Sequence, residues 1–329
     1  MISANTLKRA RHSLLAGILA LLPLTGVAKA QNYPSMPVRI IVPFAPGGTA
    51  DILARMVAKK LGDRFGQNFY IVNRTGANGA LGTEVVARAE PDGYTILMGY
   101  LGTLAISPAL YDNLPFDPLR DLAPITNIAS TTQAIIARKT LPAKSIAELI
   151  ALAKSGETVT FASAGVGSPS HLAGELFNAM AHIKMIHVPY KGSGAVLHDL
   201  MGGHVDISFG GLAAGMPAVQ SGQLRLLGVT SAKPSPGAPD TPTVAQAGLP
   251  GYEVTSWFGL LAPAGTPKPI IDLLHDEVVK IANEPDFKEK LALDGAEVIA
   301  NTPEEFQNQI KADMAKWAKV VKDNGIVAK

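Results

Sequence analysis

The sequence predicts a two-lobed α/β protein in which each lobe is a doubly wound sheet and crossover strands form a hinge. The chain has 329 residues, more than one compact core usually contains. Its 47% apolar and 17% charged content is typical of a folded globular protein. From Val38 onward, short β-rich segments alternate with helical segments, which is the pattern of parallel-sheet lobes.

The first thirty residues have the pattern of a secretory signal peptide. Lys8, Arg9 and Arg11 precede an apolar run at 14–22, and a small-residue cleavage pattern ends at Ala30. The apolar run is shorter than the roughly 20 residues that span a bilayer, so cleavage after Ala30 is favoured over a permanent anchor. We therefore expect an exported, periplasmic protein.

Charge and cysteine content narrow the possible functions. Loss of residues 1–30 removes four basic and no acidic residues, which lowers the basic count from 29 to 25 against 27 acidic residues. The mature chain is then slightly acidic, which argues against a nucleic-acid partner. With no cysteine, the chain has no disulfide, no thiolate metal ligand, no thiol nucleophile and no lipidated N-terminal cysteine.

The first lobe is predicted from its alternating pattern. Residues 38–42 form a strand, Gly47-Gly48 turns the chain, and 50–65 forms a helix with apolar residues at helical spacing. Further strands are predicted at 69–72 and 95–98.

A second series of elements begins near Ile125 and has the same plan. Its predicted strands are 125–137, 159–162, 185–188, 205–209 and 226–229, and its helices are 146–154 and 170–181.

The C-terminal part is expected to return to the first lobe. After a segment rich in Pro, Ala and Gly at 231–250, the apolar strand 252–262 crosses back, and the apolar stripe from Phe306 to Val321 predicts a packing helix. Lobe 1 is thus predicted at 31–124 and 251–329 and lobe 2 at 125–250, with hinges near Ile125 and Trp257.

The first candidate ligand loop follows strand 38–42. Open α/β sheets bind ligands at the carboxyl ends of their strands, and a helix start with nearby glycines favours an anion such as a carboxylate. The same residues are equally compatible with a simple tight turn in which Asp51 serves the helix start. The candidate ligand-binding residues here are Phe44, Ala45, Pro46, Gly47, Gly48, Thr49 and Asp51.

The second candidate loop follows strand 159–162 and again leads into a helix. It lacks the third glycine of a dinucleotide-binding loop, because Ser170 stands in that place, and it lacks the G-x-S-x-G of a hydrolase. A carboxylate site is therefore favoured over a cofactor or a catalytic serine. Its candidate residues are Ser163, Ala164, Gly165, Gly167, Ser168 and His171.

Five further residues complete the predicted ligand-binding set. Tyr100 and Thr103 follow strand 95–98 and are expected to close a wall of the site. Tyr190 and Lys191 follow another strand, where Lys191 supplies charge to an acid or is a solvated surface residue. Asp206 either accepts hydrogen bonds near the crevice or orients a local turn.

Catalytic and cofactor motifs are missing. The histidines do not have the paired spacing of a metal site, and the glycines at 76–82 lack the Gly-Lys-Ser/Thr of a phosphate-binding loop. We therefore expect no catalytic residues, no metal and no cofactor, and a monomeric binding protein rather than an enzyme.

The assembled motifs resemble the Bug, or TctC-like, solute-receptor family of tripartite tricarboxylate transporters. The resemblance extends over nearly all of residues 33–327, and several long motifs occur in one order. These are Tyr33-Pro34, Pro37 to Phe44, Pro46 to Asp51, Asn73-Arg74 with Gly76-Ala77, Pro91 to Thr95, Ser163 to His171, and Val188 to Gly192.

The resemblance implies a periplasmic binding protein fold, type II-like, that closes over a small organic acid. It also implies integral membrane permease subunits as partners, and a carboxylate gripped by the loops 44–49 and 163–168 through backbone amides, hydroxyls and water. One departure is Gly210-Gly211-Leu212 after Phe209, where many relatives have Asp or Asn. This disfavours an amino-acid ligand, whose ammonium group needs an acidic partner.

Three functions stay open at this point. The first is a transport receptor that delivers a carboxylate to a permease. The second keeps the same fold but presents the ligand to a membrane kinase as a sensor. The third is an α/β hydrolase or dehydrogenase, for which no complete nucleophile–base–orienter set, cofactor fingerprint or metal constellation is present.

Overall fold

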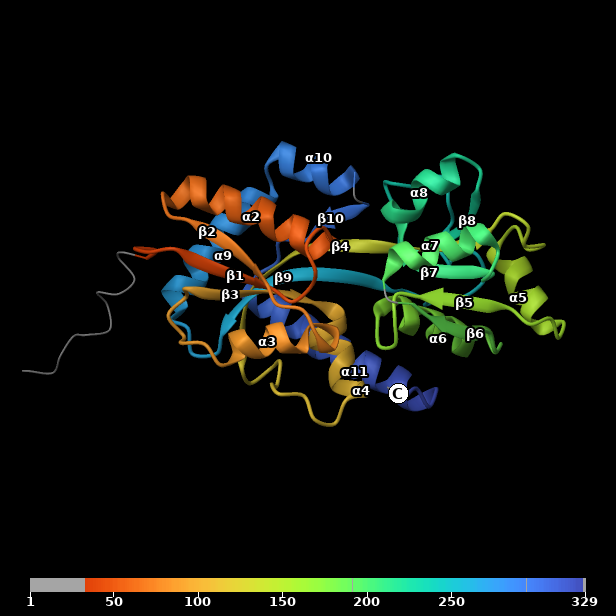
Figure 1. The fold of residues 1–329 in the computed structure, drawn as a ribbon, viewed down its shortest axis with the longest axis horizontal. Helices are drawn as coiled ribbons and strands as arrows, with labels where there is room; N and C mark the ends of the chain where they lie inside the picture. The colour runs from red at the N-terminus through yellow and green to blue at the C-terminus, as the bar shows by residue number, and fades with distance from the viewer. Residues whose placement is uncertain (1–32, 191, 294, 328–329) are drawn as a thin grey trace, which may run out of the picture.

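The computed structural model describes residues 33–190, 192–293 and 295–327, so the predicted signal peptide and its cleavage site lie outside the described residues. Figure 1 shows two α/β lobes side by side along the long axis, connected by β4 and the chain that leads into β9. The strands form one continuous path, β2-β1-β3-β9-β4-β7-β5-β6, with β10 and β8 also pairing with β4. The two-lobed α/β prediction is confirmed.

The first lobe is built on a mixed sheet. Its central strand β1 pairs in parallel with β2 and β3, and β9 joins antiparallel to β3. The strands are β1 (Val38–Val42), β2 (Phe69–Asn73), β3 (Thr95–Tyr100), β9 (Thr255–Pro263), β10 (Ala296–Val298) and the first part of β4 (Leu122–Arg138). The helices are α2 (Thr49–Phe65), α3 (Ala80–Ala87), α4 (Ser107–Leu110), α9 (Lys268–Ala282), α10 (Pro285–Leu293) and α11 (Pro303–Asp323), with short helical turns at Ala77–Gly79 and Gly102–Ile106.

The second lobe repeats the same strand order. Here β5 pairs in parallel with β6 and β7, and the second part of β4 joins antiparallel to β7. The strands are β5 (Thr160–Ser163), β6 (Ile186–Pro189), β7 (Ile207–Gly211) and β8 (Leu224–Val229). The helices are α5 (Ile146–Lys154), α6 (Pro169–Ala181), α7 (Ser193–Gly202) and α8 (Leu212–Gln220). In each lobe the first parallel strand lies between the second and the third, so the chain leaves it in one direction for the second strand and crosses to its other side for the third. Open α/β sheets bind ligands at this point, next to the first and third strands.

Strand β4 changes partners where it passes from one sheet to the other. It pairs with β9 up to Thr132 and with β7 from Gln133 onward. This point lies later in the chain than Ile125, the start of the predicted second lobe, because residues before 133 still pair with β9 of the first sheet. The chain between β8 and β9, which returns to the first lobe, is hydrogen-bonded to β4 at the same point. The Thr230 hydroxyl donates to the Val254 carbonyl oxygen at 2.6 Å and accepts from the Gln133 backbone N–H at 3.1 Å.

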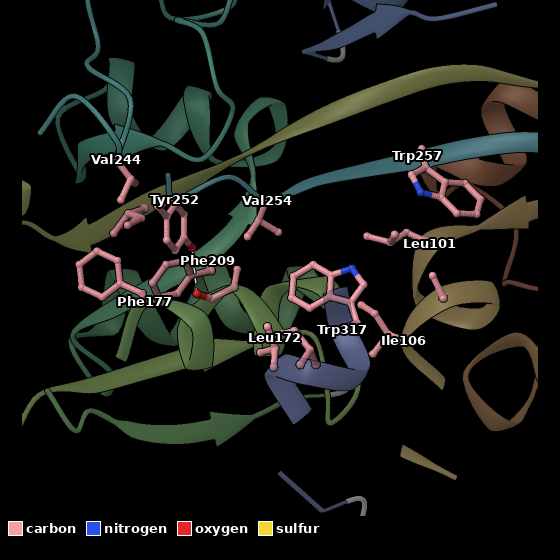
Figure 2. Packing of buried hydrophobic residues seen from close by; sticks show 14 of the residues in the cluster. Leu101, Ile106, Leu172, Phe177, Phe209, Val244, Tyr252, Val254, Trp257 and Trp317 are labelled. Carbon is pink, nitrogen blue, oxygen red and sulfur yellow. Dashed lines mark hydrogen bonds between the residues drawn. The ribbon is translucent and has the colours of Figure 1, made fainter. Parts of the chain in front are cut away.

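The C-terminal helix α11 packs against both lobes. Its Trp317 is 1% exposed and belongs to one buried apolar cluster that includes Leu172 of α6 and Ile106 of the first lobe. Figure 2 shows the Trp317 ring with Leu172 on one side and Ile106 on the other. The predicted packing role of this helix is therefore confirmed, and the packing extends across the lobe boundary. In the part of the chain that the structure describes, no helix is long and apolar enough to cross a membrane.

Candidate functional site

A cavity of about 170 Å³ lies between the lobes at the crossing strands. The first lobe contributes Thr49 and Tyr100, and the crossing strands contribute Thr131, Gln133 and Ser256. The second lobe contributes Ile136, Ala164, Ser168, Pro169, Ser170, Ser193, Val196, Leu197, Ser208, Phe209, Gly210, Gly211 and Ala214. None of these described lining residues carries a charged side chain, so the cavity is lined by hydroxyls, one amide, backbone and apolar groups.

Four helices begin at the cavity wall. Thr49 starts α2, Pro169 starts α6, Ser193 starts α7, and Gly211 is the N-cap of α8. The first turn of a helix has backbone N–H groups without helical partners and a partial positive charge. Because these starts converge on a space without acidic side chains among its described lining residues, the cavity favours an anion.

Two buried polar groups on the cavity wall have no hydrogen-bond partner among the described residues. These are Oε1 of Gln133, which is 4% exposed, and Oγ of Ser208, which is 1% exposed. A buried polar atom without a partner costs on the order of 1–3 kcal/mol. Both groups are therefore available to a bound molecule or to ordered water.

The loop after β1 is held in shape by Asp51. The carboxylate of this 2% exposed residue accepts from the Gly47 backbone N–H at 2.9 Å, from Asn73 Nδ2 at 2.9 Å, and from Arg55 in a bidentate pair at 2.9 and 3.0 Å. These hydrogen bonds, Arg55 foremost, lower the pKa of Asp51 to about 2. Asp51 thus supports the loop from beneath instead of facing the cavity.

Asp51→Ala is expected to lower the free energy of unfolding by about 2 kcal/mol, because the buried carboxylate is the common acceptor for the Gly47 N–H, the Asn73 amide and Arg55. Ligand affinity falls as well, since the start of α2 loses its support. Urea unfolding measures the first effect. The control is Asp63→Ala on the same helix, whose 65% exposed side chain pairs with Lys59 and is expected to cost under about 0.5 kcal/mol. Equal losses in both variants would contradict the assigned role.

The loop after β5 is organised by hydroxyl groups. Ser168 caps α6 by accepting from the His171 backbone N–H at 3.3 Å, and its own hydroxyl donates to the Gly165 carbonyl oxygen at 2.6 Å. Ser170 Oγ accepts from the Ala164 backbone N–H at 3.0 Å. Gly165 has a φ of 136°, a conformation that favours glycine. The loop is therefore preformed, with Ala164 and Ser168 on the cavity wall.

Two stacked histidines lie behind this loop. The rings of His171 and His187 are 3.9 Å apart at an angle of 19°. His171 Nδ1 accepts from the Gly167 backbone N–H at 3.2 Å, and His187 Nε2 lies 2.7 Å from Ser163 Oγ. Burial, and for His171 also the neighbouring His187, lowers the pKa values to about 3 and about 4 respectively. Both rings are therefore neutral at pH 7 and act as hydrogen-bonding supports of the loop.

Tyr100 faces the cavity from the end of β3. Its ring packs edge-on against Phe44 and stacks on Phe258, with centroids 5.2 Å apart in both cases. Burial raises the pKa of its hydroxyl, and a hydrogen bond with Ser256 opposes part of that rise. The phenol therefore stays protonated and joins the polar wall formed by the crossing strands.

Comparison with known proteins shows which family this chain belongs to. Residues 53–326 match the model of the tripartite tricarboxylate transporter family receptor. BugT of Bordetella pertussis is 35% identical over 318 residues, which cover 95% of this chain and 97% of BugT. The chain belongs to this receptor family.

Solved structures of related receptors have the same architecture. The Rhodopseudomonas palustris protein Rpa4515 with adipate has a TM-score of 0.82 at 38% identity, over 90% of this chain and 99% of that one. MatC of the same organism with bound malate has a TM-score of 0.78 at 32% identity, over 88% and 100%. The periplasmic binding protein BugD gives 0.79 at 36%, over 90% and 100%. The receptor is thus a solute-binding protein and not an enzyme.

Several predicted ligand residues of this TctC-family receptor do not line the cavity. Thr103 is buried and its hydroxyl donates to the Asn78 carbonyl oxygen at 2.7 Å. The Tyr190 hydroxyl donates to Asp199 at 2.8 Å, and Lys191 lies outside the described residues. Phe44 to Gly48, Ser163, Gly165, Gly167 and His171 shape the two loops without being among the lining residues.

Asp206 is placed away from the receptor's cavity. It comes immediately before β7, whereas the ligand loops follow the ends of the strands. Its carboxylate pairs with Arg138 at 2.9 Å and accepts from the backbone N–H and hydroxyl of Thr160, both at 2.8 Å. Asp206 therefore joins strands of the second sheet at the end opposite the ligand loops, which corresponds to the local structural alternative.

The polar cavity residues that lie on strands were not predicted from the sequence. These are Thr131, Gln133, Ser208 and Ser256, which occur inside segments that were recognised by their apolar content. A polar residue at an inward-facing position of a buried strand is the signal that could have identified them.

Proposed function

We propose that this receptor captures a small organic carboxylate in the cavity between its lobes and delivers it to the membrane subunits of a tripartite tricarboxylate-type transporter. The convergence of four helix starts on an uncharged cavity is the observation that carries the proposal. The adipate and malate bound by two related receptors support the ligand class.

In the proposed site, the first carboxylate lies between the starts of α2 and α6. Thr49 approaches from the first lobe, and Ala164, Ser168 and Ser170 approach from the second. Asp51 and His171 hold the two loops in place from behind. Asp206 is left out of this site.

We propose that lobe 1 comprises residues 33–132 and 255–327 and lobe 2 residues 133–254, with the hinge at the two crossings. The change of strand partners at Gln133 and the start of β9 at Thr255 support these boundaries. Ligand that contacts both lobes stabilises the closed arrangement and shifts the population toward it.

We also propose that the receptor is exported and that its signal peptide is cleaved after Ala30. The basic and apolar pattern of residues 8–22 and the solved periplasmic relatives support this. The mass of the protein recovered from a periplasmic extract tests the cleavage position.

Saturating ligand is expected to raise the melting temperature by roughly 5 °C, because ligand binds the native state and not the unfolded chain. The measurement is a thermal-shift screen of the mature protein against adipate, malate, succinate and hexanoate, with neutral sugars of similar size. A shift with sugars and none with any acid would overturn the proposal.

Gly48→Asp provides a matched variant for the same screen. Gly48 is the N-cap residue of α2, at φ −81°, and no side chain caps this helix. The nearest atom to an added Cβ is 3.9 Å away, so a Cβ fits here without a clash. The new carboxylate caps α2 and repels an incoming anion. The variant is expected to remain folded and to lose its response to all acids.

A further inference from the structure

We propose that a groove behind strand β9 is a second ligand-binding site, and that it takes a small zwitterion of the α-amino acid class, with one ammonium and one carboxylate group. The groove has a volume of about 160 Å³ and lies between α11 and the residues at the start of β9. Glu253, Thr255 and Trp257 line one side, and Asp313, Lys316 and Trp317 of α11 line the other. This volume is below the roughly 300–1,000 Å³ of sites for drug-sized molecules, so the ligand is small.

This groove and the cavity between the lobes lie on opposite faces of β9. Side chains alternate along a strand, so Thr255 and Trp257 share one face and Ser256 lies on the other. Ser256 lines the cavity between the lobes, whereas Thr255 and Trp257 line the groove. The groove is therefore separate from the site proposed for the carboxylate, and the inference does not depend on that proposal.

Asp313 and Glu253 make the groove attractive to a cation. The Asp313 carboxylate accepts a hydrogen bond from Trp257 Nε1 at 2.8 Å. Burial raises the pKa of the Asp313 carboxyl, and the nearby charge of Glu253 adds to this rise. The Trp257 hydrogen bond and Lys316 oppose only part of it, so the negative charge at Asp313 is not fully compensated within the protein. An ammonium group that contacts both carboxylates supplies the missing charge and the hydrogen-bond donors.

The indole N–H of Trp317 supplies the second, independent observation. Trp317 is 1% exposed, and its Nε1 has no hydrogen-bond partner among the described residues. Figure 2 shows this nitrogen on the edge of the ring that faces Trp257, which lines the same groove. Lys316 Nζ lies 5.2 Å from the centre of the Trp317 ring and donates to the Glu253 carbonyl oxygen at 2.7 Å, which leaves its other N–H groups for a ligand. A ligand carboxylate next to these two donors accepts hydrogen bonds from both.

The spacing of these groups on α11 matches the size of an α-amino acid. Asp313 is followed by Lys316 three positions later and by Trp317 four positions later, so the three lie on one face of the helix. Neighbours on a helix face have about 5–6 Å between their Cβ atoms. In an α-amino acid the ammonium and the carboxylate are attached to the same carbon atom. The ammonium therefore reaches Asp313 while the carboxylate reaches the two donors one turn further along the helix.

Tryptophan fluorescence reports binding in this groove directly, because both tryptophans of the chain line it. Titration of the mature protein with alanine is expected to change the emission to saturation. Alaninamide, which keeps the ammonium but has no carboxylate, is expected to bind at least tenfold more weakly. If alanine does not bind, by fluorescence and by calorimetry, or if alaninamide binds as tightly as alanine, the proposal is overturned.

Asp313→Asn and Glu253→Gln remove the two charges that the ammonium contacts. The affinity for alanine is expected to fall at least tenfold in the first variant and at least threefold in the second. Glu253 is exposed and lies outside the helices and strands, so Glu253→Gln stays informative even if Asp313→Asn does not fold. Melting curves report whether each variant is folded, and full alanine affinity in either folded variant would contradict the site.

Asp323→Asn is the matched control, because it makes the same change at the end of the same helix, on a side chain that pairs with Lys319 and lies outside the groove. It is expected to change alanine affinity by less than twofold. Gly48→Asp tests whether alanine instead binds between the lobes, and the affinity is expected to stay within twofold. A loss of alanine binding in Gly48→Asp would place alanine in the cavity between the lobes and overturn the second site, whereas the proposed function would stand.

Discussion

Trp317→Ala is expected to lower the free energy of unfolding by about 4 kcal/mol, one of the largest losses that a single substitution can cause in this protein. Trp317 is 1% exposed and packs in the apolar cluster that Leu172 and Ile106 share from the two lobes. Removing the indole leaves a cavity that the surrounding lobes cannot fill without moving relative to each other. Urea unfolding followed by far-UV circular dichroism measures the change.

Lys311→Ala on the same helix is the control for this prediction. Lys311 is exposed, so its replacement is expected to change the free energy of unfolding by less than about 0.5 kcal/mol. A loss for Trp317→Ala below about 1.5 kcal/mol would contradict the claim that α11 joins the lobes through a shared core.

Lowering the pH from 7 to 5 is expected to cost about 3 kcal/mol of stability through His171 and His187 together. Burial lowers their pKa values in the folded state to about 3 and about 4 from an ordinary value of 6.5. Between pH 6.5 and these values, the unfolded chain binds protons that the folded chain does not. Stability therefore falls as pH falls through this window, and it is recovered as pH rises above 6.5.

His187→Phe is expected to weaken this pH dependence, because Phe keeps the stacking on His171 but does not titrate. His198→Gln is the control, since the His198 side chain is 82% exposed and its replacement is expected to leave the slope unchanged. Urea unfolding of the three proteins at several pH values between 5 and 7.5 gives the slopes. Identical slopes for His187→Phe and the parent protein would remove the histidine pair as the cause.

The fold could be predicted because its elements have strong local patterns. The segments at 38–42 and 146–154 match β1 and α5 residue for residue. The crossing of β4 could not be located, because the residue at which a strand changes sheets is set by its pairing partners, and these are distant in sequence. Boundaries between lobes depend on those partners and not on local composition.

The two ligand loops could be predicted, because glycines and hydroxyls between a strand and a helix have a physical reason to be there. Thr49, Ala164 and Ser168 accordingly line the cavity. For Asp206 the sequence left two alternatives open, hydrogen bonding near the crevice or a local structural role, and the structure pairs its carboxylate with Arg138. Gln133 and Ser208 depend on which face of a strand meets the other lobe, and this becomes visible only when both sheets are assembled.

Gln133 lies at the point where β4 changes its pairing from β9 to β7. With the proposed hinge at this point, rotation of one lobe against the other displaces nearby atoms least and displaces the starts of α2 and α6 most. The polar groups that the crossing strands contribute to the cavity wall, Thr131, Gln133 and Ser256, therefore keep their places during closure, whereas the two ligand loops approach each other.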